Sequence, residues 1–151
     1  MNYIKEAENR LWYYRDLQGS TIEMQRQINR IVGRSGPQAL TAIHLDDTGV
    51  KSGRHDETIN TLFEIQRLQA AIERTQEEFG EINQLLDEIS QEQGCELYGM
   101  VLQKWYIERQ AKEAIARDIN YSSIQTVYDI KNKAIRKFAV RLFGIEALAA
   151  V

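Results

Sequence analysis

Apolar residues recur at helical spacing along two long stretches in the first part of the chain. Between residues 2 and 32, an apolar side chain returns every three or four positions, with a shift of one position at Gly19-Ser20, where we expect a bend. Between residues 56 and 93 the alternation is regular, and its members are Ile65, Leu68, Ile72, Thr75, Phe79, Ile82, Leu86 and Ile89. Such stripes are typical of amphipathic helices, and a sustained one is typical of a coiled-coil seam. The pattern predicts two long helices.

The segment 33–55, between these stripes, is expected to be a loop. The run from Gly33 to Pro37 should end the first helix, because glycine permits a left-handed cap and proline cannot continue a helix. Two long helices joined by a loop most simply fold back as an antiparallel hairpin, so residues 1–94 are predicted to form a helical hairpin domain. Pairing of the same stripes with a second copy of the chain, as a homodimer, remains the alternative.

A shorter pair of helical patterns follows the break at Gln93 to Glu96, inside a predicted second domain of residues 95–151. Its two apolar stripes are Ala111, Ala114, Ile115 and Ile119, then Val127, Ile130, Ala134, Ile135 and Phe138. Between them, Asn120 tolerates a left-handed backbone, and Ser122 can cap the second helix with Gln125 completing a capping box. This layout predicts a helix-turn-helix. The predicted core between its helices consists of Ile115, Ile119, Val127 and Ile130.

The face left exposed on the second of these helices carries the candidate chemistry. Short hydrogen-bonding side chains near the start of such a helix can reach base edges, and long cations further along suit phosphates. The candidate base-reading residues are Ser123, Gln125, Thr126 and Asp129. The candidate phosphate-contacting residues are Lys131, Lys133, Arg136 and Lys137. A small helical core with a solvated charged face would give the same pattern, and both interpretations stand at this point.

The order of motifs from Leu97 to Phe138 resembles region four of the sigma-70 family. There, a leucine-rich helix ending in an element like arginine-tyrosine-isoleucine precedes the reading pair, and here Trp105-Tyr106-Ile107 occupies that place. The chain is most similar to the phage-encoded sigma-like regulators, the group that includes the ArpU and RinA late-transcription activators. The resemblance implies a transcription regulator that binds double-stranded DNA and RNA polymerase in the cytoplasm of a bacterial host, with late phage or prophage genes as targets.

Three positions depart from the family pattern. Trp105 stands where the family has arginine, Asp129 stands where it has a basic or polar residue, and the turn before Val127 is one residue longer. If the family pattern is aligned backward from Val127, Ser123 rather than Ser122 becomes the cap of the second helix. This alignment changes which side chains of that helix would face the DNA groove. Asp129 also favours a second function, a protein-interaction adaptor or anti-activator, because phosphates repel a carboxylate, although aspartate can accept a hydrogen bond from cytosine.

Composition and charge fit an all-α protein with a basic C-terminal part. The chain has 151 residues, a single proline and a net charge of −3. Residues 1–94 hold ten Lys and Arg against sixteen Asp and Glu, whereas residues 95–151 hold nine against six. The positive balance therefore lies with the predicted helix-turn-helix, as a phosphate-facing module needs. The absence of a run of eighteen apolar residues predicts a soluble protein with no membrane partner.

No residue constellation points to an enzyme, a cofactor or a metal. Cys95 is the only cysteine, so it cannot form an intramolecular disulfide, and no base lies near it in the sequence. There is also no phosphate-binding glycine loop. Candidate metal ligands in the loop lack the rigid helical spacing that would favour a site; they are His44, Asp46, Asp47, His55 and Asp56. We therefore expect neither catalytic residues nor a metal centre.

Overall fold

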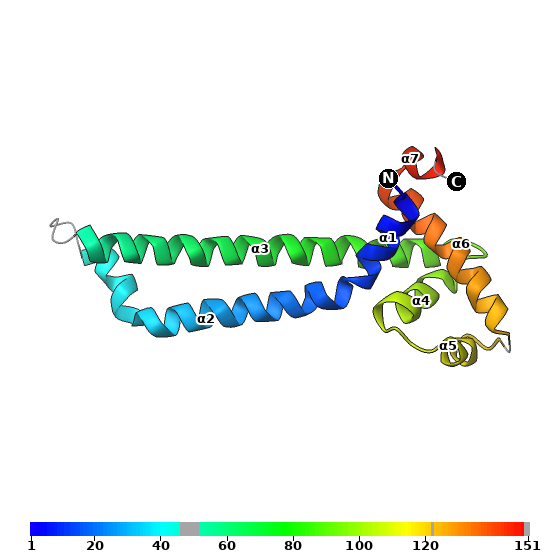
Figure 1. Cartoon of the computed structure of the whole chain (residues 1–151), viewed down its shortest axis with the longest axis horizontal. Helices are drawn as coiled ribbons and strands as arrows, with labels where there is room; N and C mark the ends of the chain where they lie inside the picture. Colours follow the sequence, from blue (N-terminus) through cyan, green and yellow to red (C-terminus); the bar gives the residue numbers. More distant parts are fainter. Residues whose placement is uncertain (46–51, 122, 150–151) are drawn as a thin grey trace. The chain divides into compact units, whose positions relative to one another are not determined.

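The computed structural model describes residues 1–45, 52–121 and 123–149, with side chains described outside 35–45 and 52–56. All regular elements in these ranges are helices (Figure 1), which confirms the all-α class there. They are α1 (Tyr3–Trp12), α2 (Tyr14–Leu45), α3 (Ser52–Ser90), α4 (Tyr98–Leu102), the π-helix η1 (Gln103–Ile107), α5 (Lys112–Asp118), α6 (Ile124–Phe143) and α7 (Ile145–Ala149).

The chain divides into two compact units, and the first of them is discontinuous in sequence. Unit 1 combines Met1–Asp16 with Glu78–Val151, and unit 2 is Leu17–Glu77. Helix α3 therefore begins in unit 2 and ends in unit 1. The apolar stripes did not predict that the first sixteen residues would share a unit with the C-terminal helices.

The first predicted helix is interrupted at Tyr13, which divides it into α1 and α2. Helix α1 starts after Asn2, whose side chain accepts a hydrogen bond from the Lys5 amide at 3.1 Å, and it ends at Trp12. Gly19 and Ser20 lie inside α2, and the bend expected there stays a prediction. The break at Tyr13 falls near the residue where unit 1 gives way to unit 2.

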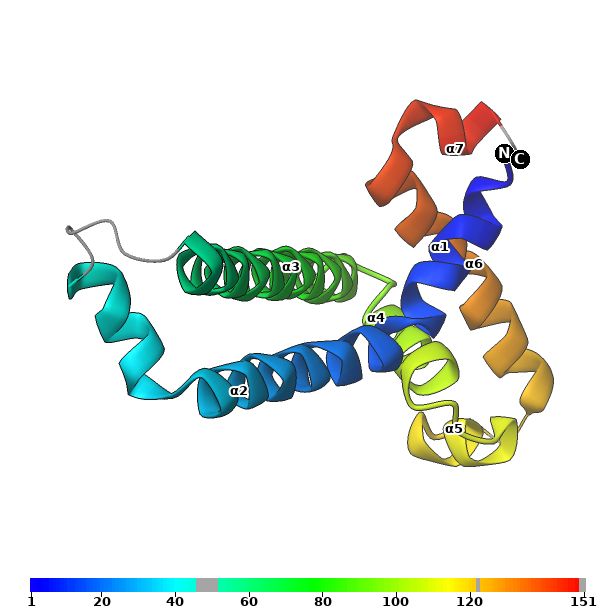
Figure 2. The same cartoon turned by 60° about the vertical axis from the view of Figure 1, so that its left-hand side comes forward.

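Helix α2 also runs further than the sequence predicts, to Leu45 instead of ending near Gly33. Gly33 does not adopt the left-handed conformation that would cap a helix there. A proline within a helix commonly kinks it without ending it, and Figure 2 shows α2 changing direction in its last part. The expected loop 33–55 is thereby shortened at both ends, because α3 starts at Ser52. Residues 46–51 lie outside the described part of the chain.

The core of unit 2 joins the two long apolar stripes. Ile28 and Ile31 of α2 pack with Leu68 of α3, and all three are buried. Half-buried apolar residues surround them; they are Met24, Ile65 and Ile72. The two stripes therefore meet within one chain over this part of their length, while pairing with a second copy stays a prediction.

The core of unit 1 is built around α6. This helix contacts α1, α4, α5 and α7. Its apolar stripe packs on α1, on the last turns of α3 and on the α4–η1 segment, and the buried residues are Ala7, Leu11, Ile82, Leu86, Ile89, Leu102, Tyr106, Ala134, Ile135, Phe138, Ala139 and Ala147. The end of the α3 stripe thus belongs to a different core from its beginning.

Tyr106 of this core also donates a hydrogen bond to Glu8 at 2.9 Å, and burial raises the pKa of its phenol.

Helix α4 approaches the end of α3 so closely that only glycine fits at position 99. The Gly99 amide donates a hydrogen bond to Ser90 Oγ at 3.0 Å, and the Ser90 hydroxyl donates to the Leu86 carbonyl at 2.9 Å. A Cβ at position 99 would lie 2.8 Å from that carbonyl oxygen and would also meet Ser90 Oγ. Glycine is unfavourable inside a helix, and this contact gives the physical reason for its presence.

Gly99→Ala is expected to destabilise unit 1, although alanine is the better helix former. Overpacking of this kind lowers the free energy of unfolding by about 1 to 3 kcal/mol. The measurement is urea unfolding followed by tryptophan fluorescence, since both tryptophans, Trp12 and Trp105, belong to unit 1. Gly80→Ala is the matched control, because nothing lies within 4 Å of its Cβ position and it should stabilise α3 by about 0.5 to 1 kcal/mol. Equal effects of the two substitutions would contradict the close approach.

Candidate nucleic-acid interface

A Schellman turn ends α5 and sets the direction of the chain into α6. Asn120 has a φ of 63°, the left-handed conformation expected from the sequence. The Tyr121 amide donates to the Ala116 carbonyl at 2.9 Å, and the Asn120 amide donates to the Arg117 carbonyl at 3.2 Å. These are the two hydrogen bonds that define the motif. The predicted role of Asn120 is confirmed, and both bonds use only the backbone.

Helix α6 begins at Ile124, with Ser123 as its N-cap residue. Ser123 has an extended backbone, and its side chain makes no capping hydrogen bond. Ser122, the first of the two predicted caps, lies outside the described residues. The Nε2 of Gln125 donates to Asp129 Oδ1 at 3.1 Å along the helix surface. The capping box expected between Ser122 and Gln125 involves a residue outside the described set and stays a prediction.

A small apolar core holds α5 against α6. Ile115, Ile119 and Val127 are buried there, and Ile130 is half-buried against them, as the stripes predict. Ala116 is buried in the same cluster. The sequence analysis missed Val101, a fully buried residue of α4 that joins this core. In the sequence, only its position within the apolar run Met100-Val101-Leu102 indicates that Val101 is buried.

The outward face of α6 is polar, and it gathers most of the predicted base-reading residues. Ser123, Gln125 and Asp129 are exposed, and Thr126 is half-buried. Asn132, which the sequence analysis did not single out, is also exposed. At 3.6 residues per turn it shares a face with Gln125 and Asp129, so it extends this polar surface by one turn.

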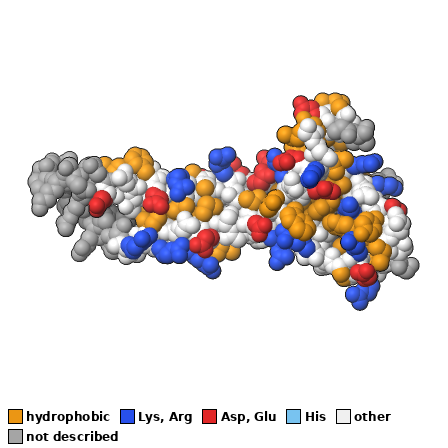
Figure 3. Space-filling model, viewed as in Figure 1, with side chains coloured by type: hydrophobic (Ala, Val, Ile, Leu, Met, Phe, Trp, Pro, Cys, Tyr) orange, Lys and Arg blue, Asp and Glu red, His pale blue; other side chains and the backbone are white. Residues whose placement is uncertain are grey.

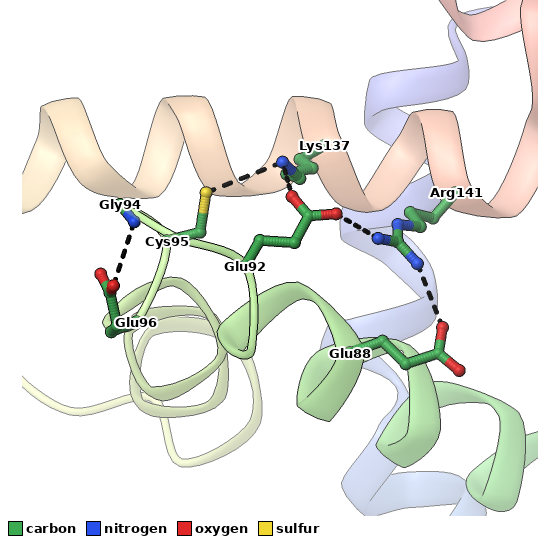
Figure 4. A network of polar contacts seen from close by, with 7 residues as sticks. All are labelled: Glu88, Glu92, Gly94, Cys95, Glu96, Lys137 and Arg141. Carbon is green, nitrogen blue, oxygen red and sulfur yellow. Dashed lines mark hydrogen bonds and ion pairs between the residues drawn. The ribbon is translucent and has the colours of Figure 1, made fainter.

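The four predicted phosphate-contacting cations have different surroundings. Lys133 and Arg136 are exposed, and in the described part of the chain neither forms an ion pair with a carboxylate. Lys137, by contrast, pairs with Glu92 and donates to Cys95 Sγ at 3.7 Å (Figure 4). The charge of Lys137 is therefore already paired with a carboxylate of unit 1.

The network of Figure 4 fixes α6 to the end of α3. Arg141 pairs with Glu88 at 3.1 Å and also with Glu92, which Lys137 contacts from its other side. Past these contacts, the chain turns through Gly94, which has a φ of 83°, and the Gly94 amide donates to a Glu96 carboxylate oxygen at 3.0 Å. The turn expected at Gln93 to Glu96 is confirmed.

The fourth cation, Lys131, lies against aromatic rings. Its Nζ is 4.9 Å from the ring centroid of Trp105 and 6.0 Å from that of Tyr128. Lys112 of α5 approaches the same two rings, at 5.2 Å and 5.4 Å. We call these four residues the aromatic–lysine cluster. Figure 3 shows hydrophobic side chains gathered over α4 and α5 with Lys and Arg side chains among them.

Comparison with known proteins adds no assignment. No protein-family model, no curated protein and no solved structure matches this chain. Within the described ranges, no helix is long and apolar enough to cross a membrane. The described residues also contain no group of three or more His, Cys, Asp or Glu placed to hold a metal. The side chains of the loop candidates from His44 to Asp56 lie outside the described set.

Proposed function

We propose that this protein is a sequence-specific, DNA-binding regulator of transcription, with α5 and α6 acting as a helix-turn-helix. The observation that carries the proposal is the exposed face of α6, where polar side chains are followed by Lys133 and Arg136 without carboxylate partners in the described chain. A Schellman turn and a buried core hold this face in place. In such modules the second helix enters the major groove with its N-terminal residues at the base edges.

The polar residues of α6 suit direct readout of bases. Gln125 carries a donor and an acceptor that match the major-groove edge of adenine, and Asp129 can accept from the amino group of cytosine. Their mutual hydrogen bond holds both side chains on the outward face. Ser123 and Thr126 lie near the start of the helix, where a hydroxyl can reach a base edge or a phosphate. We add Asn132 to this set because it shares their face.

Phosphate contact is assigned to the cations of α6 that pair with no carboxylate in the described ranges. Lys133 and Arg136 fill this role, and Lys131 contributes through the aromatic–lysine cluster. We leave Lys137 out, because a contact with DNA would have to compete with its ion pair to Glu92. From the resemblance to sigma region four, we also propose RNA polymerase as a partner and late phage or prophage genes as targets.

Substitutions on the two parts of the face should weaken DNA binding in different ways. Gln125→Ala is expected to cost about 1 to 3 kcal/mol on the preferred site and to flatten discrimination at one base pair. Lys133→Ala or Arg136→Ala should weaken all sequences about equally and lower the salt slope by about one, since one fewer counterion is released. Lys5→Ala, an exposed lysine of α1, is the control for a lost charge.

The measurement requires a preferred site and a salt series. Selection from a random duplex pool, with and without RNA polymerase, supplies the site. Binding constants for the parent and the four variants are then measured on the selected and scrambled duplexes at several salt concentrations. If the parent shows no salt-dependent duplex binding, the proposal is wrong.

The second candidate function is a protein-interaction adaptor or anti-activator. The exposed carboxylate of Asp129, in the middle of the polar face, favours it, because DNA phosphates repel a negative charge. Asp129→Asn separates the two functions. On a scrambled duplex, where base reading does not enter, this substitution should leave DNA binding unchanged or strengthen it if α6 enters the groove, whereas it should weaken binding to a basic partner surface if the adaptor function is correct.

A further inference from the structure

A helix in the major groove has a phosphate strand on each side, and the exposed Lys133 of α6 lies toward only one of them. At 100° per residue, Tyr128 lies about 140° around the helix from Lys133. Gln125 and Asn132, on the proposed reading face, fall between these two positions. The flank marked by Tyr128 is where the aromatic–lysine cluster lies, with residues from η1, α5 and α6.

The cluster holds two ammonium groups over one pair of rings. The centroids of Trp105 and Tyr128 are 5.0 Å apart, with an angle of 74° between the ring planes. Lys112 and Lys131 each approach both rings at 4.9 to 6.0 Å. The electron-rich face of an aromatic ring attracts a cation, so these contacts position the ammonium groups. They do not neutralise them, since the rings carry no net charge.

Two carboxylates near η1 pair with a different lysine. Lys104, beside Trp105 in η1, pairs with Asp118 at 3.0 Å and lies 3.9 Å from Glu108. Over the described residues, neither Lys112 nor Lys131 forms an ion pair with a carboxylate. Two ammonium groups without a carboxylate partner among the described residues attract an anion, and a phosphate that reaches either of them gains a favourable charge interaction. Lys112 is exposed, so such an anion has access to the cluster.

We propose that Lys112 and Lys131, positioned over Trp105 and Tyr128, bind the backbone phosphates of duplex DNA on the flank of α6 opposite Lys133. This inference rests on the proposed function, because it takes α6 to lie in the major groove. It assigns a role to Trp105, which stands where the resembled family has arginine. Trp105 lacks the charge that an arginine would supply at this position. Its ring instead lies against two lysines from separate helices, Lys112 of α5 and Lys131 of α6.

The test compares the salt dependence of duplex binding in charge-removing and charge-retaining variants of the full chain. Lys112→Met and Lys131→Met keep an unbranched apolar stem over the rings and remove the charge. Each should lower the slope of log binding constant against log salt by about 0.9, and the double variant should lower it by about twice that. Lys112→Arg and Lys131→Arg should retain the slope, and so should the control Lys5→Met. The duplex is a scrambled sequence, so that base reading does not enter.

Tryptophan fluorescence gives a second readout at the proposed contact. In a Trp12→Phe background, Trp105 is the only tryptophan, and its emission should change on titration with duplex in step with binding. The change should be lost in the double methionine variant and kept in Lys133→Ala.

Unchanged slopes and an unchanged emission response in the double variant, with the parent still binding DNA, would overturn the phosphate contact and leave the proposed function standing. A parent that binds no duplex would overturn both.

Discussion

Phe138→Ala is expected to lower the free energy of unfolding of unit 1 by about 3 to 5 kcal/mol, the range for truncating a buried aromatic residue. Phe138 has no exposed surface and lies in the core that α6 shares with α1, α3, α4, η1 and α7. The surrounding residues come from several elements, among them Leu11 and Ile82, so the site cannot collapse by moving one helix. Most of the cavity should therefore remain, and the cost should lie near the upper end of the range.

Urea unfolding followed by tryptophan fluorescence measures this effect, because Trp12 and Trp105 both belong to unit 1. Ile145→Ala is the control, since that side chain is 77% exposed and its truncation should change stability by no more than about 0.5 kcal/mol. Circular dichroism followed in parallel reports the helices of both units. A Phe138→Ala variant that unfolds at the same urea concentration as the parent would show that α6 is not seated as described.

Ile115→Ala should cost about 2 to 5 kcal/mol, because it removes a fully buried side chain from the core between α5 and α6. Ile130→Ala, at a half-buried position of the same cluster, should cost less than Ile115→Ala. The comparison tests the register of α6 with chemically identical changes. A larger cost at Ile130 would mean that α6 is rotated relative to its described position.

The features predicted correctly from the sequence were those whose physical cause is local. Asn120 is left-handed because its short amide side chain tolerates that backbone, and the chain around it completes the turn. Ile115 and Ile119 lie on the apolar face of the α5 stripe and Val127 lies on that of α6, because helical spacing places them there, and the turn between the two helices brings these faces together. Both features are set by neighbouring stretches of the sequence.

The partner of an apolar stripe was not predictable in the same way. The stripe of α3 continues without interruption from Ile65 to Ile89, yet Leu68 belongs to the core of unit 2 and Ile82 to that of unit 1. Periodicity shows which face of a helix is apolar and says nothing about the element that covers it. The break at Tyr13 has the same origin, because no glycine or proline marks it.

The surroundings of the cations could not be read from the sequence either. Lys133 and Lys137 are the same residue type four positions apart. Among the residues that the structure describes, only Lys137 of the two pairs with a carboxylate, that of Glu92, which lies 45 positions earlier in the chain. Trp105 and Lys131 were noted separately, as a departure from a motif and as a phosphate candidate. Their contact depends on the packing of η1 against α6, which no local pattern encodes.

The discontinuous composition of unit 1 sets the order in which a nascent chain can fold. Synthesis proceeds from the N-terminus, so residues 17–77 are complete before any of α6 leaves the ribosome. Ala7 and Leu11 of α1 must wait for Phe138 before their core can close. The entropic cost of joining such distant segments grows only slowly with the length between them, so the delay is set mainly by translation. Until α6 emerges, the part of the apolar face of α1 that α6 covers is open to chaperones and proteases.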